Sequence, residues 1–263
     1  MTTIAISNQK GGVGKTTTAI SLGAALAARG PRVLIIDLDP QANATSGLGV
    51  GKHRDRAIYG VLLREEPITQ AIVPTAVSGL DLLPSSLEMA GAEVELVPVL
   101  ARELRLRTAL AGLSGYDTIL VDCPPSLGLL TINALTAADG VIIPVQAEYL
   151  ALEGLAHLLS TIEAVKARLN PRLEILAIVL TMDDRRNRLS LQVAEEVRRH
   201  FPDLLARVSI PRAVRLAEAP SHGQPISIYD PASRGAQAYA DLAHEIAARL
   251  AARRPVPVAG AIA

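Results

Sequence analysis

Short apolar runs rich in valine and isoleucine alternate along the chain with longer segments of helical periodicity. Buried strands are predicted at 3–7, 32–37, 80–84, 117–122, 140–145 and 173–181. Helices are predicted at 15–29, 86–112 with a break near Pro98, 128–138, 151–169, 189–200 and 233–252. Because few polar residues interrupt the strand runs, both faces of the sheet should be covered, which is typical of a parallel sheet.

This alternation predicts an α/β fold with a doubly wound, mostly parallel sheet and helices on both faces. Ligands of such folds bind beyond the carboxyl ends of the strands. No repeat or linker divides the sequence, so residues 1–252 are expected to form a single domain. Residues 47–57 are a polar, glycine-rich loop, and the proline-containing tail 253–263 is expected to be disordered.

Composition narrows the class of protein. The 263 residues carry no net charge and are 49% hydrophobic, so any nucleic-acid site must be a local patch. Cys123 is the sole cysteine, which excludes an intrachain disulfide and a CxxC metal site. Apolar runs fall short of the roughly 18 residues of a membrane helix, and residues 1–20 do not resemble a signal peptide. A cytoplasmic protein is expected.

The segment NQKGGVGKTTTA, which follows the first predicted strand and opens the first helix, is close to the phosphate-binding pattern G-x-x-x-x-G-K-[ST]. Gln9 replaces the first glycine of that pattern. Glycines let backbone N–H groups turn toward a phosphate, the lysine contacts the β- and γ-phosphates, and the next hydroxyl binds Mg²⁺. A glycine-rich turn without a ligand is the alternative. The expected contacts are Gly11, Gly12, Val13, Gly14, Lys15, Thr16 and Thr17.

Carboxylates follow two of the predicted strands. DTILVD ends in Asp122, in the Walker B pattern that places an aspartate to hold Mg²⁺ through water. VLIIDLD ends in Asp37 and Asp39, and we expect Asp39 to reach the cleft, where it orients or deprotonates the attacking water. The predicted metal site therefore combines Thr16, Asp39 and Asp122. Asp37 is expected either to make internal hydrogen bonds or to support the magnesium from outside its ligands.

The base of the nucleotide is less clearly marked. The sequence has no N-K-x-D stretch to read guanine, and Met182 stands where such a motif would lie. Adenine is therefore favoured over guanine, and the predicted cofactors are ATP and Mg²⁺.

A lysine before the glycines, as in KGGVGKT, is the deviant Walker A signature. Together with other blocks in the same order, it makes nearly the whole chain resemble the ParA/Soj group of the ParA–MinD ATPases. Those blocks are DLDPQANATSGLG, YDTILVDCPPSLGLLTINAL, VIIPVQAEYLALEGL and IPRAVRLAEAPSHGQPI.

The resemblance implies a role for the additional lysine, Lys10. In the family, the leading lysine reaches across a dimer interface to the phosphates bound by the partner subunit. Lys10 is thus expected, with Lys15 and Asp39, among the catalytic residues. The resemblance also places Pro211, Arg212 and Ala213 beside the adenine, although many relatives have asparagine at the position of Ala213. It places Glu148 and Glu153 in the dimer-facing region.

The resemblance further implies an ATP-dependent homodimer that binds nonspecific double-stranded DNA on the nucleoid. A ParB/Spo0J-type partner would stimulate hydrolysis of ATP to ADP and phosphate. Relatives that hold iron–sulfur clusters or use CxxC pairs are disfavoured by the cysteine count. A MinD-like membrane ATPase is disfavoured because ARRPVPVAGAIA is not an amphipathic helix, so no membrane partner is expected. A ligase of the dethiobiotin-synthetase type is the other alternative.

Arginines concentrate late in the chain, where residues 183–215 contain eight arginines and five acidic residues. Such a basic surface can hold DNA phosphates, and the scarcity of aromatic residues there, with Phe201 the single Phe, Tyr or Trp, favours duplex backbone over stacked bases. The alternative is that some of these arginines pair with Glu195 and Glu196 along a helix. The individual candidates for DNA contact are Arg188, Arg215 and Arg234.

Overall fold

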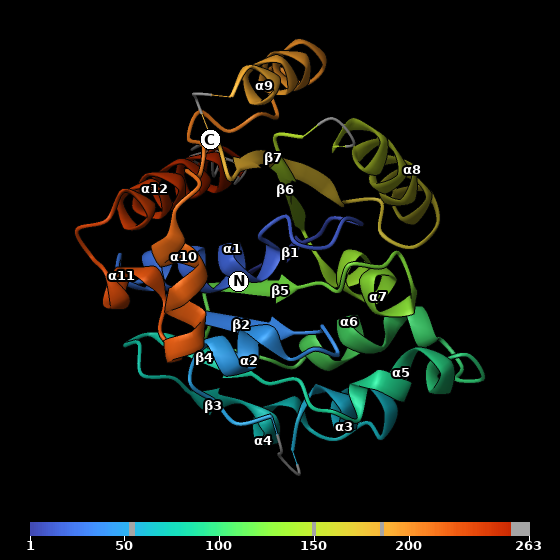
Figure 1. The fold of residues 1–263 in the computed structure, drawn as a ribbon. Helices are drawn as coiled ribbons and strands as arrows, with labels where there is room; N and C mark the ends of the chain where they lie inside the picture. Colours follow the sequence, from blue (N-terminus) through green and yellow to red (C-terminus); the bar gives the residue numbers. More distant parts are fainter. Residues whose placement is uncertain (53–55, 149–150, 185–186, 254–263) are drawn as a thin grey trace, which may run out of the picture.

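The structure is a computed structural model that describes residues 1–52, 56–148, 151–184 and 187–253 (Figure 1). The predicted disordered tail therefore falls, beyond Arg253, outside the described residues. Arg185 and Arg186, two of the arginines counted above, also lie outside them. In the described part of the chain, no helix is long and apolar enough to cross a membrane.

The predicted sheet is confirmed. Its strands are β1 (Thr2–Ile6), β2 (Val33–Asp37), β3 (Val73–Pro74), β4 (Leu80–Leu83), β5 (Thr118–Asp122), β6 (Gly140–Gln146) and β7 (Glu174–Thr181). They form one seven-stranded sheet in the order β3-β4-β2-β5-β1-β6-β7. Neighbouring strands pair in parallel except at the edge, where the short β3 runs antiparallel to β4. The sequence pattern did not predict β3, because it is only two residues long.

The long helices also match the predictions, and the predicted break near Pro98 separates α5 from α6. They are α1 (Lys15–Ala27), α5 (Met89–Leu96), α6 (Arg105–Leu110), α7 (Leu129–Ala137), α8 (Ala151–Arg168), α9 (Arg188–His200) and α12 (Arg234–Arg253). Shorter helices, too brief to show periodicity, were not predicted. These are α2 (Asn43–Gly47), α3 (Ile58–Leu63), α4 (Ile68–Ala71), α10 (Val214–Glu218) and α11 (Ile226–Tyr229).

Helices cover both faces of the sheet, and each face has its own apolar core (Figure 1). Neighbouring residues of β2 show the division, since Leu34 packs into the core with α3, α5, α6, α7 and α8, whereas Ile35 packs into the core with α1 and α12. Side chains of a strand alternate between faces, so a strand buried on both sides needs apolar residues throughout. This explains the unbroken hydrophobic run in the sequence.

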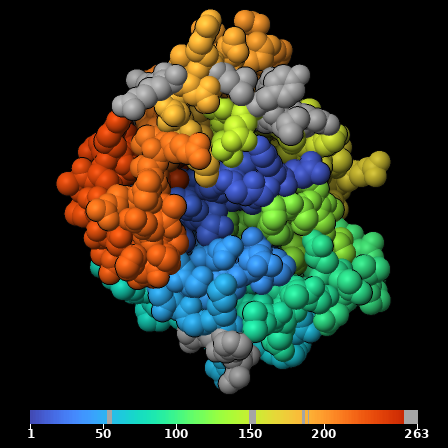
Figure 2. All heavy atoms as spheres, in the orientation of Figure 1, coloured from blue at the N-terminus to red at the C-terminus, as the bar shows by residue number. Residues whose placement is uncertain are grey.

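The carboxyl ends of the central strands meet at one edge of the sheet. In the strand register Asp122 lies beside Ile6 of β1 on one side and beside Asp37 of β2 on the other. The segments that leave these strands therefore begin next to one another. In the space-filling view, the N-terminal segment (blue) reaches the surface between the orange C-terminal part and the green middle part of the chain (Figure 2).

Candidate nucleotide-binding site

The loop between β1 and α1 has the backbone of a phosphate cradle. Gly12 and Gly14 have φ angles of 74° and 86°, in the left-handed region that side chains other than glycine rarely adopt. Helix α1 begins directly after Gly14 and has no side-chain cap at its first turn. Its N–H groups and the helix dipole are therefore available to an anion.

Lys15 is folded into this loop. Its side chain is buried, and its Nζ donates to the backbone oxygen of Lys10 at 3.0 Å. Burial lowers the pKa of Lys15, while Asp122, Cys123 and Asp39 nearby raise it. Lys15 therefore lies among the acidic residues at the ends of β2 and β5. A phosphate with its cation would suit this setting, because the phosphate would face the lysine and the cation would face the carboxylates.

Lys10 has a different environment. Its Nζ forms an ion pair with Glu148 Oε2 at 2.7 Å, and both side chains are partly exposed. Gln146 Nε2 donates to the other oxygen, Glu148 Oε1, at 2.5 Å. The structure thus gives Lys10 a partner within its own chain, which the sequence did not predict. Glu153 lies in the first turn of α8, and the side chains of residues 151–153 are outside the described part of the structure.

Asp122 is a fully buried carboxylate at the end of β5. Within the described residues, neither of its oxygens has a hydrogen-bond partner. Burial raises its pKa well above the usual range and the Asp37 carboxylate adds to this, while the Thr16 hydroxyl and Lys15 act in the opposite direction. A buried charge of this kind is costly unless an ion or a donor meets it, so its setting fits a bound cation.

The donor set fits magnesium in particular. The described ranges contain no metal-binding group of three or more side chains from histidine, cysteine, aspartate and glutamate. Mg²⁺ does not need such a cage, because it commonly binds one or two carboxylates together with phosphate oxygens and water. Asp122 and the Thr16 hydroxyl, which lie close together, supply that arrangement once a nucleotide contributes its phosphates.

Asp37 and Asp39 follow one another at the end of β2 but face different surroundings. Asp37 is fully buried and accepts hydrogen bonds from Thr45 N, Thr45 Oγ1 and Asp39 N at 2.8, 2.7 and 3.1 Å. Burial nevertheless raises its pKa to about 6. Asp39 Oδ1 accepts a bond from Gln41 N at 2.9 Å, and Oδ2 has no hydrogen-bond partner among the described residues. The internal hydrogen bonds predicted as one role of Asp37 are therefore present in the structure.

A cavity of about 360 Å³ lies next to the phosphate loop, on the side of α1 and β7. Its walls include Gly14 and Thr17 from the loop, Met182 after β7, and the segment from Pro211 to Ala213. The structure thus brings together the residues predicted to contact the adenine, and the volume lies within the range of small-molecule sites. Met182 has a φ angle of 51°, an uncommon conformation for a side chain of its size.

Contacts that the sequence did not reveal hold these parts together. Thr181 Oγ1 donates to Val13 O at 2.8 Å, which fastens β7 to the phosphate loop. The segment before Pro211 runs beside β7, because Ile210 N donates to Leu180 O and Asp183 N donates to Ile210 O. No local pattern marks these pairs, since their members are distant along the chain.

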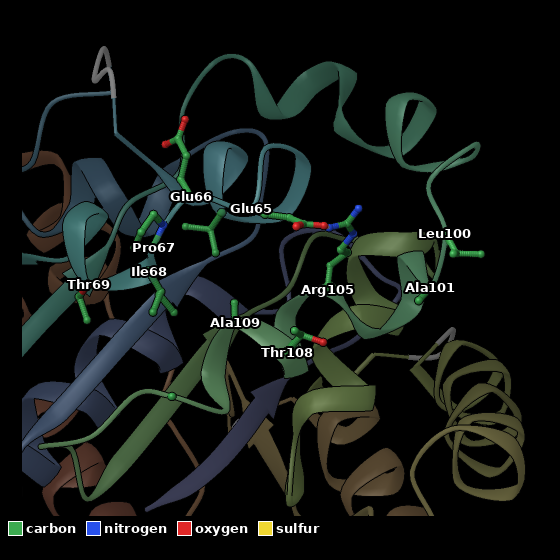
Figure 3. Close-up of a pocket in the computed structure, with 12 residues that line it drawn as sticks. Glu65, Glu66, Pro67, Ile68, Thr69, Leu100, Ala101, Arg105, Thr108 and Ala109 are labelled. Atoms are coloured by element: carbon green, nitrogen blue, oxygen red, sulfur yellow. The ribbon is translucent and has the colours of Figure 1, made fainter.

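A larger cavity, of about 630 Å³, lies between α3, α4 and α6, away from the phosphate loop. Figure 3 shows Glu65 and Arg105 pointing toward one another across it, and they form an ion pair. None of the predicted site residues lines this cavity. The volume of a cavity therefore does not indicate the candidate nucleotide site. The glycine loop and the buried carboxylates indicate it instead.

The candidate DNA-binding arginines lie on the surface. Arg188 at the start of α9 and Arg234 at the start of α12 are exposed and have no ion pair with any described residue. Arg215 is exposed too, but it pairs with Glu218 at 3.0 Å and with Asp230 at 3.7 Å. Along α9 Arg199 pairs with Glu196, as the alternative interpretation of the arginines expected.

Known proteins resemble this chain over nearly its whole length. A family model described as an AAA domain matches residues 1–175. The sporulation initiation inhibitor protein Soj of Bacillus subtilis is 56% identical, covering 93% of this chain and 98% of that protein. The chromosome partitioning protein ParA of Caulobacter vibrioides is 54% identical, covering 94% of each chain.

Among solved structures, a cobyrinic acid a,c-diamide synthase from Mycobacterium smegmatis with a bound ATP analogue and magnesium has a TM-score of 0.85. It is 38% identical, and the match covers 98% of each chain.

Proposed function

Because the chain belongs to the ParA/Soj family of chromosome-partitioning proteins, we propose that it is a Mg-ATP-dependent switch for DNA partitioning. In the proposed cycle, ATP joins two copies of the chain, the dimer holds nonspecific double-stranded DNA, and hydrolysis releases it. A ParB/Spo0J-type partner stimulates the hydrolysis. The protein acts in the cytoplasm, on the nucleoid.

One observation carries the proposal most directly. Asp122 is buried without a hydrogen-bond partner among the described residues, at the end of β5 and beside Lys15 and Thr16. A magnesium nucleotide supplies what this arrangement lacks, because the cation meets the carboxylate and the hydroxyl while the phosphates meet the lysine and the loop N–H groups. The cavity beside Gly14 and Thr17 has room for the base.

The residues of the chain divide the work of hydrolysis. The loop N–H groups and Lys15 bind and orient the phosphates, with Thr17 directed at the α-phosphate. Mg²⁺, held by Thr16 and through water by Asp122 and Asp39, would reduce the negative charge of the β- and γ-phosphates. Asp39 orients the attacking water and accepts its proton as the water oxygen bonds to the γ-phosphorus and the bond to ADP breaks.

Lys10 connects hydrolysis to dimerisation. A second ammonium group near the γ-phosphate offsets its charge, and in the proposed dimer the partner subunit supplies it. Lys10 must then leave Glu148, with which it pairs in this chain. Partly exposed ion pairs contribute only about 0–1 kcal/mol, so the exchange of a carboxylate for a phosphate costs little.

Replacing Lys10 with alanine should abolish ATP-dependent dimers while leaving ATP binding by the monomer within about twofold, because Lys15 remains in the loop. Scattering or sedimentation of the variant with Mg-ATP measures the first effect, and nucleotide titration measures the second. Lys166→Ala on α8 is the matched control and should dimerise like the original chain. Normal dimerisation of Lys10→Ala would contradict the role across the interface.

Replacing Asp39 with alanine should slow hydrolysis by about 100-fold or more, as expected for the loss of a group that handles the attacking water. The variant should remain as an ATP dimer and stay on DNA longer than the original chain. Phosphate release and DNA retention measure the two effects. Hydrolysis at the original rate would mean that another carboxylate acts.

An amide-forming ligase with the same fold is the competing function, and a MinD-like membrane ATPase is a third. Identity above one half to Soj and ParA, against 38% to the diamide synthase, supports the partitioning switch. The discriminating measurement is stimulation of the ATPase. A switch responds to DNA together with its protein activator, a ligase to a carboxylate substrate, and a membrane ATPase to lipid vesicles.

A further inference from the structure

A closed ring of buried hydrogen bonds surrounds the backbone of Asp39. Asp39 N donates to Asp37 Oδ1 at 3.1 Å, and Thr45 N and Oγ1 donate to Asp37 Oδ2 at 2.8 and 2.7 Å. Ser85 N donates to Thr45 Oγ1 at 2.9 Å, and Ser85 Oγ donates to Asp39 O at 2.8 Å, which closes the ring. Of these four residues Asp39 is the most exposed, at 7%, and the others are at 0%.

The ring joins three parts of the fold that are distant in sequence. Asp37 ends β2, Thr45 lies in α2, and Ser85 lies in the segment after β4. Pairing of Ile36 with Leu83 in the sheet brings the ends of β2 and β4 together. Helix α2 has no side-chain cap of its own, so the bond from Thr45 N to Asp37 also fastens the start of this short helix to the sheet.

The ring holds both backbone groups of Asp39, and this limits where its carboxylate can lie. Oδ1 is occupied by Gln41 N at 2.9 Å, whereas Oδ2 has no hydrogen-bond partner in the described part of the chain. Asp39 is close enough to Lys15 to raise the pKa of that lysine. The Asp39 carboxylate therefore lies within electrostatic range of Lys15, the lysine proposed to contact the phosphates.

We infer that Thr45 and Ser85 are positioning residues for ATP hydrolysis, whose hydroxyls hold the Asp39 backbone so that its carboxylate stays aligned with the attacking water. This inference rests on the proposed function, in which Asp39 handles that water. Neither hydroxyl touches the nucleotide in this assignment. A displacement of about 1 Å in a catalytic group can reduce the rate by about 100-fold, which gives the ring a measurable effect.

Ser85→Ala removes the bond to Asp39 O and leaves the Ser85 backbone bond to Thr45 in place. It should lower the kcat of ATP hydrolysis by about 10- to 100-fold while the Kd for ATP changes less than about twofold. Thr45→Val should have the same effect. Thr45→Ser keeps the hydroxyl and should restore kcat to within about threefold of the original.

Two other buried hydroxyls provide matched controls. Ser86 and Thr136 are buried, and within the described residues their hydroxyl oxygens have no hydrogen-bond partner. Ser86→Ala and Thr136→Val each remove a hydroxyl group that forms none of the hydrogen bonds of the ring, so kcat should stay within about twofold of the original chain. Melting curves of all variants identify any change that is only a loss of folding.

A double variant separates positioning from a general structural effect. In an Asp39→Ala background, single-turnover hydrolysis should not slow further when Ser85→Ala is added, because the ring acts through Asp39. A further tenfold loss there, or a normal kcat in Ser85→Ala alone, would overturn the inference. If Asp39→Ala itself hydrolyses ATP normally, the proposed role of Asp39 fails instead, and the two failures are thus distinguishable.

Discussion

Lys10 and Lys15 belong to the same loop, yet the folded chain treats them differently. Lys15 is buried and donates to the backbone of Lys10, whereas Lys10 is partly exposed and pairs with Glu148. A compact ammonium group suits the buried position of Lys15, where it donates to a backbone oxygen of the same loop. The family resemblance implied different roles for the two lysines, but not that one of them has a carboxylate partner in its own chain.

Asp122 shows how a proposed magnesium ligand can lower the stability of the protein without its metal. Its pKa is raised in the folded chain, so the folded state binds more protons than the unfolded state between the two pKa values. The free energy of unfolding therefore falls as the pH rises through that interval. Below the pKa that Asp122 has in the unfolded chain, Asp122 does not lower the stability, because it is protonated in both states.

Asp122→Asn should consequently raise the melting temperature of the ligand-free protein at pH 8, and the gain should vanish near pH 4. A gain of about 1 kcal/mol corresponds to about 2–4 °C in a chain of this size. Melting curves across this pH range make the measurement. Asp241→Asn, on the exposed side of α12, is the control and should change nothing. An equal gain at both pH values would contradict the explanation.

Among the elements, α1 packs against α12 beside the proposed nucleotide site. The hydroxyls of Thr18 on α1 and Tyr239 on α12 lie 3.1 Å apart and are buried. Tyr239 also lines the cavity beside the phosphate loop. The last helix of the chain therefore supports the first, and this pairing could not be inferred from the helical periodicity of either segment.

Tyr239→Phe should destabilise the protein by about 1 kcal/mol, because it leaves the Thr18 hydroxyl without its buried partner. The melting temperature should fall by about 2–4 °C. Tyr229→Phe, whose hydroxyl bonds to Glu218 in a part-buried setting, is the matched control and should cost less. Equal losses in the two variants would show that the α1–α12 bond contributes nothing specific.

For the whole molecule, a neutral net charge coexists with exposed arginines on α9, on α10 and at the start of α12. Electrostatic binding to DNA releases counterions, so affinity depends on salt and not on DNA sequence. The ion pairs of Arg215 with Glu218 and Asp230 must give way to phosphate if this residue contacts DNA.

DNA affinity of the ATP-bound protein should accordingly fall with salt, with log K decreasing by about 0.9 per decade of salt for each phosphate neutralised. Arg188→Ala, Arg215→Ala and Arg234→Ala should each weaken binding and reduce this slope by about one phosphate. Arg29→Ala, at the opposite edge of the sheet after α1, should not. Affinity that is independent of salt would place DNA binding elsewhere.

The local motifs were sufficient for the fold class and for the place of the glycine loop between the first strand and the first long helix. Strands buried on both faces must be apolar throughout, glycines must stand where φ is positive, and carboxylates that meet a cation must follow the strands. These requirements act on neighbouring residues, so they can be read in a linear sequence. Short elements such as β3 and α2 escaped prediction because they hold too few residues to show a period.

The pairing of residues across the chain required the folded structure. Lys10 with Glu148, Thr181 with Val13, and Ser85 with Asp39 are contacts between segments that no local pattern connects. The sheet order, with β1 between β5 and β6, is what brings such segments to one edge. Sequence therefore specified which chemical groups the site contains, whereas packing of the sheet specified how they are held, because long-range geometry depends on the whole chain at once.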